Sequence, residues 1–373
     1  MPLTQISSAV LNIPDVSVAL ANESVPNGIK SYIDAHDSLK ADLLNPNFSG
    51  IPTAPTAVIG THTNQLATTA FVTASLIGSN TSLSTIPYSA WNAVAFGNGI
   101  FVAVGNMSGN DITATSIDAI NWTVHQQPLY HSWSNIVFGS GIFIATGMTD
   151  NDVNAMSTDG VNWVVITLPI HKTWHITYGD GTFVGVNNDT TSTTAAVSTD
   201  GMTWITSTLP ENQGWGQVVF GNGMFVAFPV NDSSYITSIS TDGVNWSSGS
   251  VPVAANWISL IFGNGLFVAI GGSVNNMIVV TSTDGSNWNH SPFPIGQWSN
   301  ITYGNGMFVA ISKNYSGSSV NPCSSTITFS SDAVNWNIRE IFSNNWSNAV
   351  FDPVNNNFLC LPHLGTFVVH FNP

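Results

Sequence analysis

Tryptophan recurs in two registers of one repeat, and this periodicity restricts the fold more than any other feature of the chain. One clear copy spans 133–163, with the sequence WSNIVFGSGIFIATGMTDNDVNAMSTDGVNW. Tryptophans that match its first residue lie at 91, 133, 174, 215, 257, 298 and 346. Those that match its last residue lie at 122, 163, 204, 246, 288 and 336, and the two series together include all 13 Trp. A self-similar period of about 40 residues is typical of propellers and solenoids.

Each repeat predicts four short β-strands, which we name A to D in chain order. Strand A is of the WSNIVF type and ends at a GNG-like turn, and strand B is of the IFIAT type. Strand C is of the VNAMS type and runs into STDGVNW, whose Asp-Gly pair predicts a type I′ turn. Strand D carries the second Trp and stops before a Pro. Four short strands per unit, joined by tight turns, indicate a β-propeller.

The two ends of the repeat region predict how the ring closes. The unit that begins at Trp346 provides strands A to C, the last over 366–371, and has no strand D. The segment LSTIPYSAW before Trp91 resembles the end of a strand D, so residues 81–87 are expected to complete the last blade. Such closure removes the open sheet edges. We therefore predict a mostly β protein with a seven-bladed β-propeller of four-stranded blades over 80–373.

Residues 1–79 lack the repeat and predict a small extended and helical region. Apolar residues recur at spacings of three and four from Ile29 to Leu43, which predicts a helix over about 28–44. Its narrow apolar stripe fits either a helix packed on its own domain or a coiled coil that sets an oligomer. Thr63 is an expected N-cap for a second helix over about 64–77.

Composition excludes several classes of function. Charged residues make up only 7% of the chain, its net charge is −15, and Lys and Arg total 5. Nucleic-acid binding and docking on anionic lipid both need clustered cations, so neither is expected. The two cysteines, Cys323 and Cys360, form no CxxC pair, which argues against a disulfide scaffold and a zinc site. No signal peptide and no stretch that could insert into a membrane is evident.

Repeat variation predicts where a ligand binds. The A–B and C–D turns are nearly identical from blade to blade, whereas the B–C and D–A connections differ in every blade. Variation confined to one face indicates a binding surface. The varied connections include 148–153, 187–193, 230–235, 125–132, 170–173 and 211–214, and the insertion at 313–325. That insertion fits either a contact with a neighbouring subunit or part of a receptor site.

The strand-A tryptophans lie beside this face. They can be wedges of the core, or some can present an indole to a sugar. Trp174 is the strongest candidate for the sugar, because its strand is one residue shorter than its siblings and two histidines flank it. The predicted receptor-binding residues are Tyr130, His131, His171, Trp174, His175, Asn212, Gln213, Trp257 and Tyr315. The strand-D tryptophans are expected to pack beneath the turns.

The segment NPNFSGIPTAPTAVIGTHTNQLATTAFV at 45–72 resembles a segment found in many bacteriophage tail-fibre proteins, where a PTAPTA-like stretch leads into an ATTAFV-like helix. The resemblance implies a virion fibre or spike. It also implies that residues 1–79 attach to other tail or baseplate proteins, usually as a homotrimer. Such a protein is made in the host cytoplasm and acts outside the cell on a host-surface glycan or protein receptor. A structural adaptor and a polysaccharide depolymerase remain as alternatives.

STDGVNW is also similar to the Asp-box turn of sialidases, with one residue fewer. A sialidase needs three arginines, and this chain has only Arg339. A glycosidase needs two carboxylates about 5–10 Å apart, and the pairing of Asp150 or Asp152 with Asp189 is no better supported than other Asp pairs. Histidines gather in the same connections without metal-ligand spacing. We therefore expect no catalysis, no metal and no cofactor.

Overall fold

In the computed structural model, the chain divides into two units, Met1–Ser79 and Asn80–Pro373. The structure describes residues 81–373 except 108–109, 127–132, 148–153, 171–172, 191, 230–233, 274–275, 313–324, 342–345 and 364. The predicted helices at 28–44 and 64–77 therefore lie outside the described residues. All regular elements in the described part are β-strands. No helix there has the length and apolar character needed to cross a membrane.

Five sheets are separate four-stranded blades with antiparallel neighbours. Two of them consist of β5 (Trp133–Gly139), β6 (Ile142–Gly147), β7 (Asn154–Ser157) and β8 (Val164–Ile166), and of β9 (Thr173–Gly179), β10 (Thr182–Asn187), β11 (Thr194–Ser198) and β12 (Ile205–Thr208). The third consists of β13 (Trp215–Gly221), β14 (Met224–Pro229), β15 (Ile236–Ser240) and β16 (Ser247–Ser250). The others consist of β17 (Trp257–Gly263), β18 (Leu266–Ser273), β19 (Asn276–Ser282) and β20 (Asn289–Pro292), and of β21 (Trp298–Gly304), β22 (Met307–Ser312), β23 (Ser325–Ser330) and β24 (Asn337–Ile341).

The remaining strands form one continuous sheet rather than separate blades. Its order is β25 (Trp346–Asp352), β26 (Asn357–Pro362), β27 (Gly365–Phe371), β1 (Thr81–Gly97), β2 (Ile100–Met107), β3 (Asn110–Ser116) and β4 (Thr123–Gln126). The prediction of seven four-stranded blades is therefore wrong, since only five sheets have that form. The physical reason is β1, a 17-residue strand whose first part pairs with β27 and whose second part pairs with β2.

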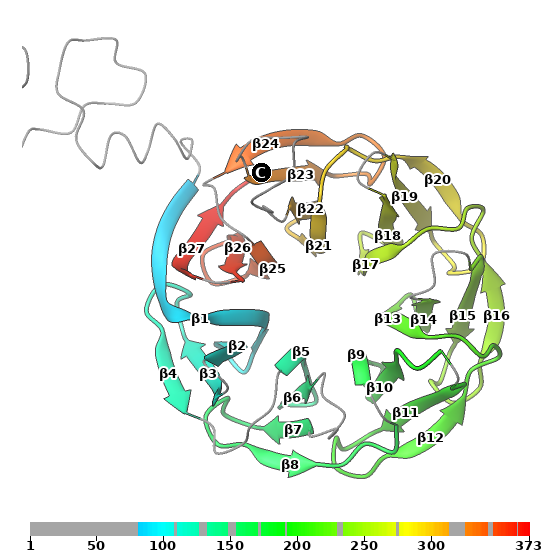
Figure 1. Cartoon of the computed structure of the whole chain (residues 1–373), viewed down its shortest axis with the longest axis horizontal. Helices are drawn as coiled ribbons and strands as arrows, with labels where there is room; N and C mark the ends of the chain where they lie inside the picture. Colours follow the sequence, from blue (N-terminus) through cyan, green and yellow to red (C-terminus); the bar gives the residue numbers. More distant parts are fainter. Residues whose placement is uncertain are drawn as a thin grey trace, which may run out of the picture. The chain divides into compact units, whose positions relative to one another are not determined.

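The inner strands contact one another in a closed circle. β1 contacts β5, and the series continues through β9, β13, β17, β21 and β25 back to β1. Figure 1 shows this ring, in which β1 crosses from the outer edge to the inner strands. Residues 81–85 of β1 pair with 367–371 of β27, so the two ends of the described chain meet in one sheet. The molecule beyond residue 80 is a β-propeller.

The type I′ turns occur between strands A and B, not at the Asp-Gly pair where the sequence predicted them. Asn222 and Gly223 have φ values of 48° and 76°, and both central residues of a type I′ turn need positive φ. In the C–D connection of the same sheet only Gly243 has positive φ, at 74°. The sequence rule failed there because this connection is held by side-chain hydrogen bonds of its Ser and Asp, described below.

The core is repeated in every sheet. Each strand B contributes a Phe that is at most 1% exposed: Phe101, Phe143, Phe183, Phe225, Phe267, Phe308 and Phe358. The A and B strands also bring two aromatic rings together, as in Phe138 and Phe143, whose centroids are 4.7 Å apart. Burial of such rings contributes to the hydrophobic stabilisation of each sheet.

Successive sheets pack through a contact between a glycine and an aromatic ring. The last residue of strand A is Gly in six cases, and a Cβ there would overlap a ring of the next sheet. The pairs are Gly97–Phe138, Gly139–Tyr178, Gly179–Phe220, Gly221–Phe262, Gly263–Tyr303 and Gly304–Phe351. Close approach of backbone to a ring is a position that only glycine satisfies. β25 departs from this pattern, because its last residue is Asp352.

Candidate functional site

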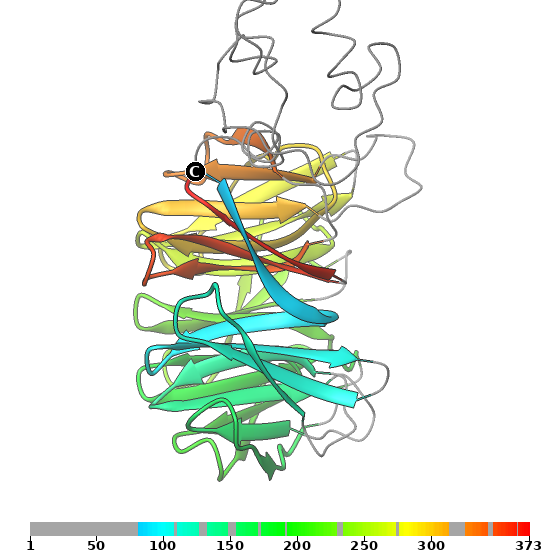
Figure 2. The ribbon, with the colours of Figure 1, turned by 90° about the vertical axis from the view of Figure 1, so that its left-hand side faces the viewer.

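The propeller has two chemically different faces. The side chain of Asn98, in the turn between β1 and β2, donates to the carbonyls of Gly141 and Thr158, at 3.0 and 3.2 Å. The A–B turn of one sheet therefore lies beside both the A–B and the C–D turns of the next sheet. Since neighbouring strands are antiparallel, the B–C and D–A connections lie on the opposite face. Figure 2 shows the ring from its side, with hairpin turns along one side of it. We call the two sides the constant face and the variable face.

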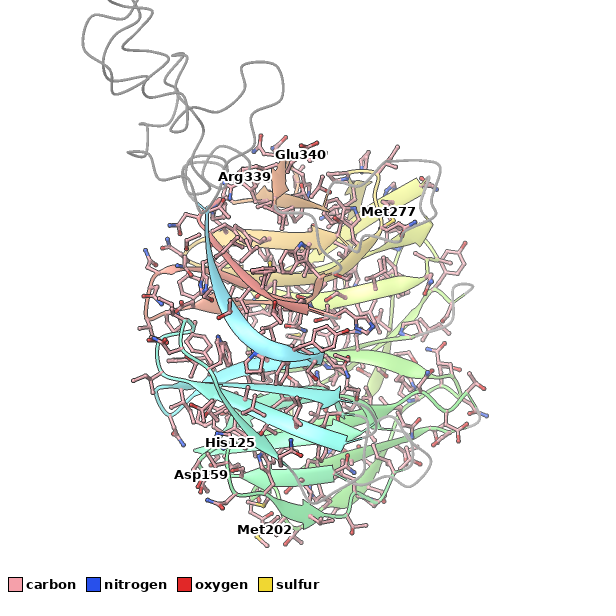
Figure 3. All side chains as sticks on the ribbon, turned by 60° about the vertical axis from the view of Figure 1, so that its left-hand side comes forward. His125, Asp159, Met202, Met277, Arg339 and Glu340 are labelled. Atoms are coloured by element: carbon pink, nitrogen blue, oxygen red, sulfur yellow. The ribbon has the colours of Figure 1, made fainter. Side chains whose placement is uncertain are left out.

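On the constant face, each C–D connection is a closed hydrogen-bonded box. In one of them Asp242 Oδ1 accepts from the backbone N–H groups of Val244 and Asn245, at 2.8 and 2.7 Å. Asp242 Oδ2 accepts from the Asn245 side chain at 2.7 Å, and Trp246 Nε1 donates to the carbonyl of Gly243 at 2.8 Å. Figure 3 marks Asp159 and Met202, which belong to two neighbouring boxes. These bonds hold the connection, so the box has a structural role.

The same bonds lower the pKa of the box carboxyls. For Asp242 the main cause is the backbone hydrogen bond from Asn245, followed by that residue's side chain and the N–H of Val244. For Asp200 the backbone bonds from Thr203 and Met202 lower the pKa to about 2. The pKa is lowered at every box Asp: Asp118, Asp159, Asp200, Asp242, Asp284 and Asp332. All six carboxylates are therefore ionised at neutral pH.

These shifts predict a loss of stability in acid. A carboxyl whose folded pKa is depressed stabilises the fold fully above its unfolded pKa of about 3.9, and that contribution is lost as the pH falls through the folded pKa. We expect Asp242→Asn to melt below the wild type at pH 5, and the difference to shrink towards pH 2. Thermal unfolding across this range measures it. Ile338→Ala is the control, because Ile338 is 59% exposed and carries no ionisable group. A constant difference for Asp242→Asn would contradict the prediction.

The tryptophans of strand A belong to the core. Those whose side chains are described are between 0% and 5% exposed: Trp91, Trp133, Trp215, Trp257, Trp298 and Trp346. Trp257 was predicted to bind the receptor, but it is 5% exposed and its ring meets that of Phe228 edge-on, with centroids 5.0 Å apart. Its indole is not open to a sugar, because the neighbouring sheet covers it. The strand-D tryptophans lie beneath the boxes as predicted, and each donates to the carbonyl three residues earlier.

Trp174 occupies a different register from these tryptophans. In β9, Thr173 pairs with Asn187 at the position where the other sheets place Trp, and Trp174 falls at the irregularity before His175. The equivalent positions elsewhere are Asn92, Ser134, Gly216, Ile258, Ser299 and Ser347, none of them aromatic. The one-residue displacement inferred from the sequence is therefore present in the backbone. It places this Trp at the variable-face end of an inner strand.

His175 lies on β9 beside the next sheet. Its side chain is partly exposed, but the ring Nδ1 is shut off from water and has no hydrogen-bond partner. Burial lowers the pKa of His175 to about 4, and a hydrogen bond with the backbone of Val218 acts in the opposite direction. The imidazole is therefore neutral at physiological pH, and it serves as a polar spacer between β9 and β13 rather than as an exposed cation.

Two described connections on the variable face, those after β10 and before β13, lie side by side. Asn187 donates to the carbonyl of Thr194 at 3.1 Å and so fixes the start of the B–C connection. Gln213, from the D–A connection, donates to the carbonyl of Ile236 at 3.3 Å, and the neighbouring Asn212 is exposed. Gly214 lies so close to Asn188 that a Cβ would come within 3.0 Å of its carbonyl oxygen. The B–C connection of the sheet β9–β12 and the D–A connection that leads from it to β13 therefore form one amide-rich surface.

The other predicted site residues cannot be placed. Tyr130, His131, His171 and Tyr315 lie outside the described residues, as does the side chain of Trp174. Of the predicted set, Asn212 and Gln213 are consecutive residues of the connection before β13, and His175 lies on β9. In the described part no cluster of His, Cys, Asp or Glu could hold a metal ion. Cys360 is a buried free thiol.

The sequence analysis missed a set of polar residues that join the inner strands. Asn92 donates to the carbonyl of Trp133 at 2.7 Å, and Gln217 donates to that of Ile258 at 3.4 Å. Asn300 accepts from the N–H of Ala349 at 3.3 Å. The signal was a polar residue one or two positions after each strand-A Trp. These side chains fix the spacing of the sheets that carry the variable connections.

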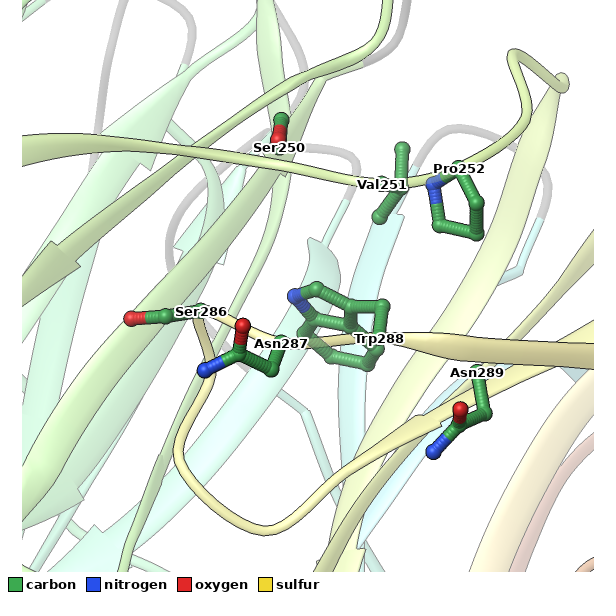
Figure 4. A pocket seen from close by; sticks show the side chains of 7 residues that line it. All are labelled: Ser250, Val251, Pro252, Ser286, Asn287, Trp288 and Asn289. Atoms are coloured by element: carbon green, nitrogen blue, oxygen red, sulfur yellow. The ribbon is translucent and has the colours of Figure 1, made fainter.

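An open crevice of about 410 Å³ lies between two sheets, away from the predicted residues. Figure 4 shows its lining, formed by Ser250, Val251, Pro252, Ser286, Asn287, Trp288 and Asn289. Trp288 is only 9% exposed because Phe228 and Phe267 hold its ring. The crevice is polar, and the indole offers little surface to a ligand. We therefore place the candidate site on the variable face.

Comparison with known proteins identifies the fold. No protein family and no curated protein matches the chain by sequence. A streptogramin B lyase structure matches with a TM-score of 0.62 and 13% identity, covering 79% of this chain and 99% of that chain. Virginiamycin B lyase from Staphylococcus aureus matches with a TM-score of 0.63 and 13% identity, and YCF48 from Cyanidioschyzon merolae with a TM-score of 0.58 and 14% identity. Each match covers 79% of this chain and 99% of the other chain. At such identities the likeness shows the fold alone.

The comparison also corrects the prediction that the chain is not an enzyme. That prediction came from sparse acids and a single Arg. Two of the similar structures are lyases, which are enzymes, so membership of this fold gives no ground for excluding catalysis. The likeness assigns no reaction to this chain.

Proposed function

We propose that this chain is a bacteriophage tail-fibre or spike protein whose propeller binds a host-surface receptor through its variable face. One observation carries the proposal: the two faces are built differently. Each box on the constant face repeats the same hydrogen bonds, whereas the opposite connections differ in length and composition from sheet to sheet. Repeat proteins that vary one face on a fixed frame use that face for binding.

The chemistry of this face favours a glycan. Its described polar groups include the amides of Asn188, Asn212 and Gln213, which can both donate to and accept from sugar hydroxyls. The backbone of Trp174 lies at the end of a neighbouring inner strand, and an indole there would offer an apolar plane to a pyranose. Binding sites commonly combine such an aromatic surface with a few placed polar groups. A protein receptor is the other class of ligand that the face could take.

The N-terminal sequence supports a place for this protein in a phage virion. The resemblance at 45–72 to tail-fibre proteins favours a role for residues 1–79 in attachment to other tail or baseplate proteins and in homotrimer formation. Three propellers on one fibre raise the apparent affinity for a multivalent surface without any new contact, so that each site can be weak. The protein would then reside in the virion and act outside the host cell.

The test is binding of the full-length protein to a glycan array and to host cells. We expect Trp174→Ala and Gln213→Ala each to weaken binding at least tenfold, which corresponds to about 1.4 kcal/mol, while circular dichroism and thermal unfolding stay close to wild type. Ile338→Ala is the matched control, because Ile338 is 59% exposed on β24, away from the variable face. Unchanged host binding by both site variants would contradict the proposal. Release of reducing ends in the same samples would identify a depolymerase.

A further inference from the structure

The junction at which the ring closes has a different chemistry from the others. Asp352 ends β25 at the position where six other inner strands have Gly, and it is fully buried. His370 on β27 is 4% exposed and pairs with Leu359. In the sheet β9–β12, the residues that match Asp352 and His370 are Gly179 and Val197. Two ionisable groups thus replace two apolar or small residues at the junction formed by both ends of the described chain.

His370 is held against the closing strand. Its Nε2 lies 2.7 Å from the hydroxyl of Ser84 on β1, and that hydroxyl also lies within 3.3 Å of the carbonyl of Ala119 in the next box. Residues Thr85 and Asn121 form an isolated parallel bridge alongside. One serine therefore connects β27, the closing segment of β1 and the box between β3 and β4.

The carboxylates of Asp352 and Asp118 lie near this histidine. Asp352 accepts from the backbone N–H groups of Val354 and Asn355, at 2.8 and 3.0 Å. Asn355 Nδ2 donates both to Asp352 Oδ2 at 2.8 Å and to the carbonyl of Asp118 at 2.9 Å. These bonds tie the turn after β25 to the first box. The junction is thus a connected polar network within an otherwise apolar interface.

A serine and a histidine at 2.7 Å suggest a nucleophile and its base, but the repeat gives another explanation. Ser207 occupies the position of Ser84 in the sheet β9–β12 and donates to the carbonyl of Gly243 at 3.0 Å, with no histidine beside it. Thr208 and Asn245 repeat the parallel bridge. Ser84 is 9% exposed, so a substrate has little access to it. At both places the serine donates to the carbonyl of a neighbouring box, and the histidine is what distinguishes this junction.

The histidine responds to pH because the closed junction disfavours its charge. Burial lowers the pKa of His370, while the charges of Asp352 and Asp118 oppose that effect and leave a net lowering. When the closing segment detaches, His370 meets water and its pKa returns towards about 6.5. The detached form therefore binds the proton more readily. The contribution of His370 to closure is complete above about pH 6.5 and is lost as the pH falls towards the folded pKa.

We propose that Ser84, His370 and the carboxylates of Asp118 and Asp352 form an acid-sensitive clasp for residues 81–85. Protonation of His370 releases this segment from β27 before the other sheets unfold. The opening constant is the equilibrium constant for detachment of residues 81–85 from β27. Because opening is linked to the binding of one proton, this constant rises at most tenfold for each pH unit below about 6.5. This inference does not depend on the proposed receptor function.

Hydrogen exchange of the full-length protein tests the clasp. Opening constants are compared between pH 7.5 and pH 5, after correction for the intrinsic exchange rate, for peptides that cover 81–89 and 365–371. Peptides that cover β12 and β16 are the reference. We call the peptides 81–89 and 365–371 the seam peptides. We expect the ratio of their opening constants to those of the reference peptides to rise by up to tenfold per pH unit below about 6.5 in the wild type, and to stay constant in His370→Gln.

His290→Gln is the matched control, since His290 is exposed on β20 and its replacement should leave the pH response intact. Parallel changes in seam and reference peptides, or a pH response that survives in His370→Gln, would overturn the clasp. If His370→Gln does not fold, NMR titration of His370 in the wild type decides. A folded pKa at or above about 6.5 contradicts the proposal, and a lower one supports it.

Discussion

Trp257→Ala is expected to lower the free energy of unfolding by about 3–5 kcal/mol, the usual cost of truncating a buried aromatic residue to alanine. Trp257 is 5% exposed, and both it and Trp288 meet the ring of Phe228 edge-on with centroids 5.0 Å away. Its loss would leave a cavity in the packing between two sheets. Urea unfolding, followed by circular dichroism and Trp fluorescence, measures the change.

The same variant decides between the core and the receptor roles of this tryptophan. We expect the fraction that remains folded to bind the receptor as the wild type does. Trp174→Ala is the natural comparison, because the register of Trp174 differs. For this variant we expect weaker receptor binding and a stability close to that of the wild type. If Trp257→Ala kept wild-type stability and lost binding, its indole would have to be accessible, and the packing described above would be wrong.

Gly221→Ala is expected to cost about 3 kcal/mol, near the upper end of typical overpacking. A Cβ at Gly221 would overlap the ring of Phe262, starting at the ring carbon nearest the backbone. That part of the ring cannot move without displacing β17, so the strain spreads into the interface between the two sheets. The change in the urea midpoint gives the size of the effect.

Gly223→Ala separates this clash from general effects of replacing glycine. A Cβ at Gly223 would meet nothing within 4 Å, and only its φ of 76° is unfavourable for alanine, at about 1–2 kcal/mol. The double variant Gly221→Ala with Phe262→Leu should cost less than the sum of the single changes, since the residues share one contact. Additive costs, or equal costs at Gly221 and Gly223, would contradict the proposed interface.

The propeller fold was predictable because the repeat sets both the position of the core and the length of each strand. The sheet topology was only partly predictable. The sequence around Pro87 does not show that the outer segment and the inner segment form one strand, β1, which joins both ends of the repeat region into one sheet. Separate blades were therefore predicted. The turn type was also missed, because Asp-Gly is a strong local signal that the hydrogen bonds of Ser240 and Asp242 override.

The site was less predictable than the fold, because a buried Trp and an exposed Trp look the same in the sequence. The position of a Trp in the repeat does not show whether its indole is buried or exposed. At Trp257 the neighbouring sheet buries the indole. The exception at Trp174 was detectable because its strand is one residue short, which shifts the register. The hydrogen bond from Gln213 to Ile236 of the next sheet depends on how the ring is assembled, and spacing along the chain carries no such information.

The course of β1 determines how the molecule responds to a pull. Its first residue, Thr81, pairs with Phe371 on the side of the constant face, and the strand then runs towards the variable face beside β27. A pull applied at Thr81 and directed away from the variable face would therefore act along the strand. The hydrogen bonds of 81–85 with 367–371 are loaded together in shear rather than opened one after another. Because β1 closes the ring, the force on this junction is shared among the hydrogen bonds between β1 and β27.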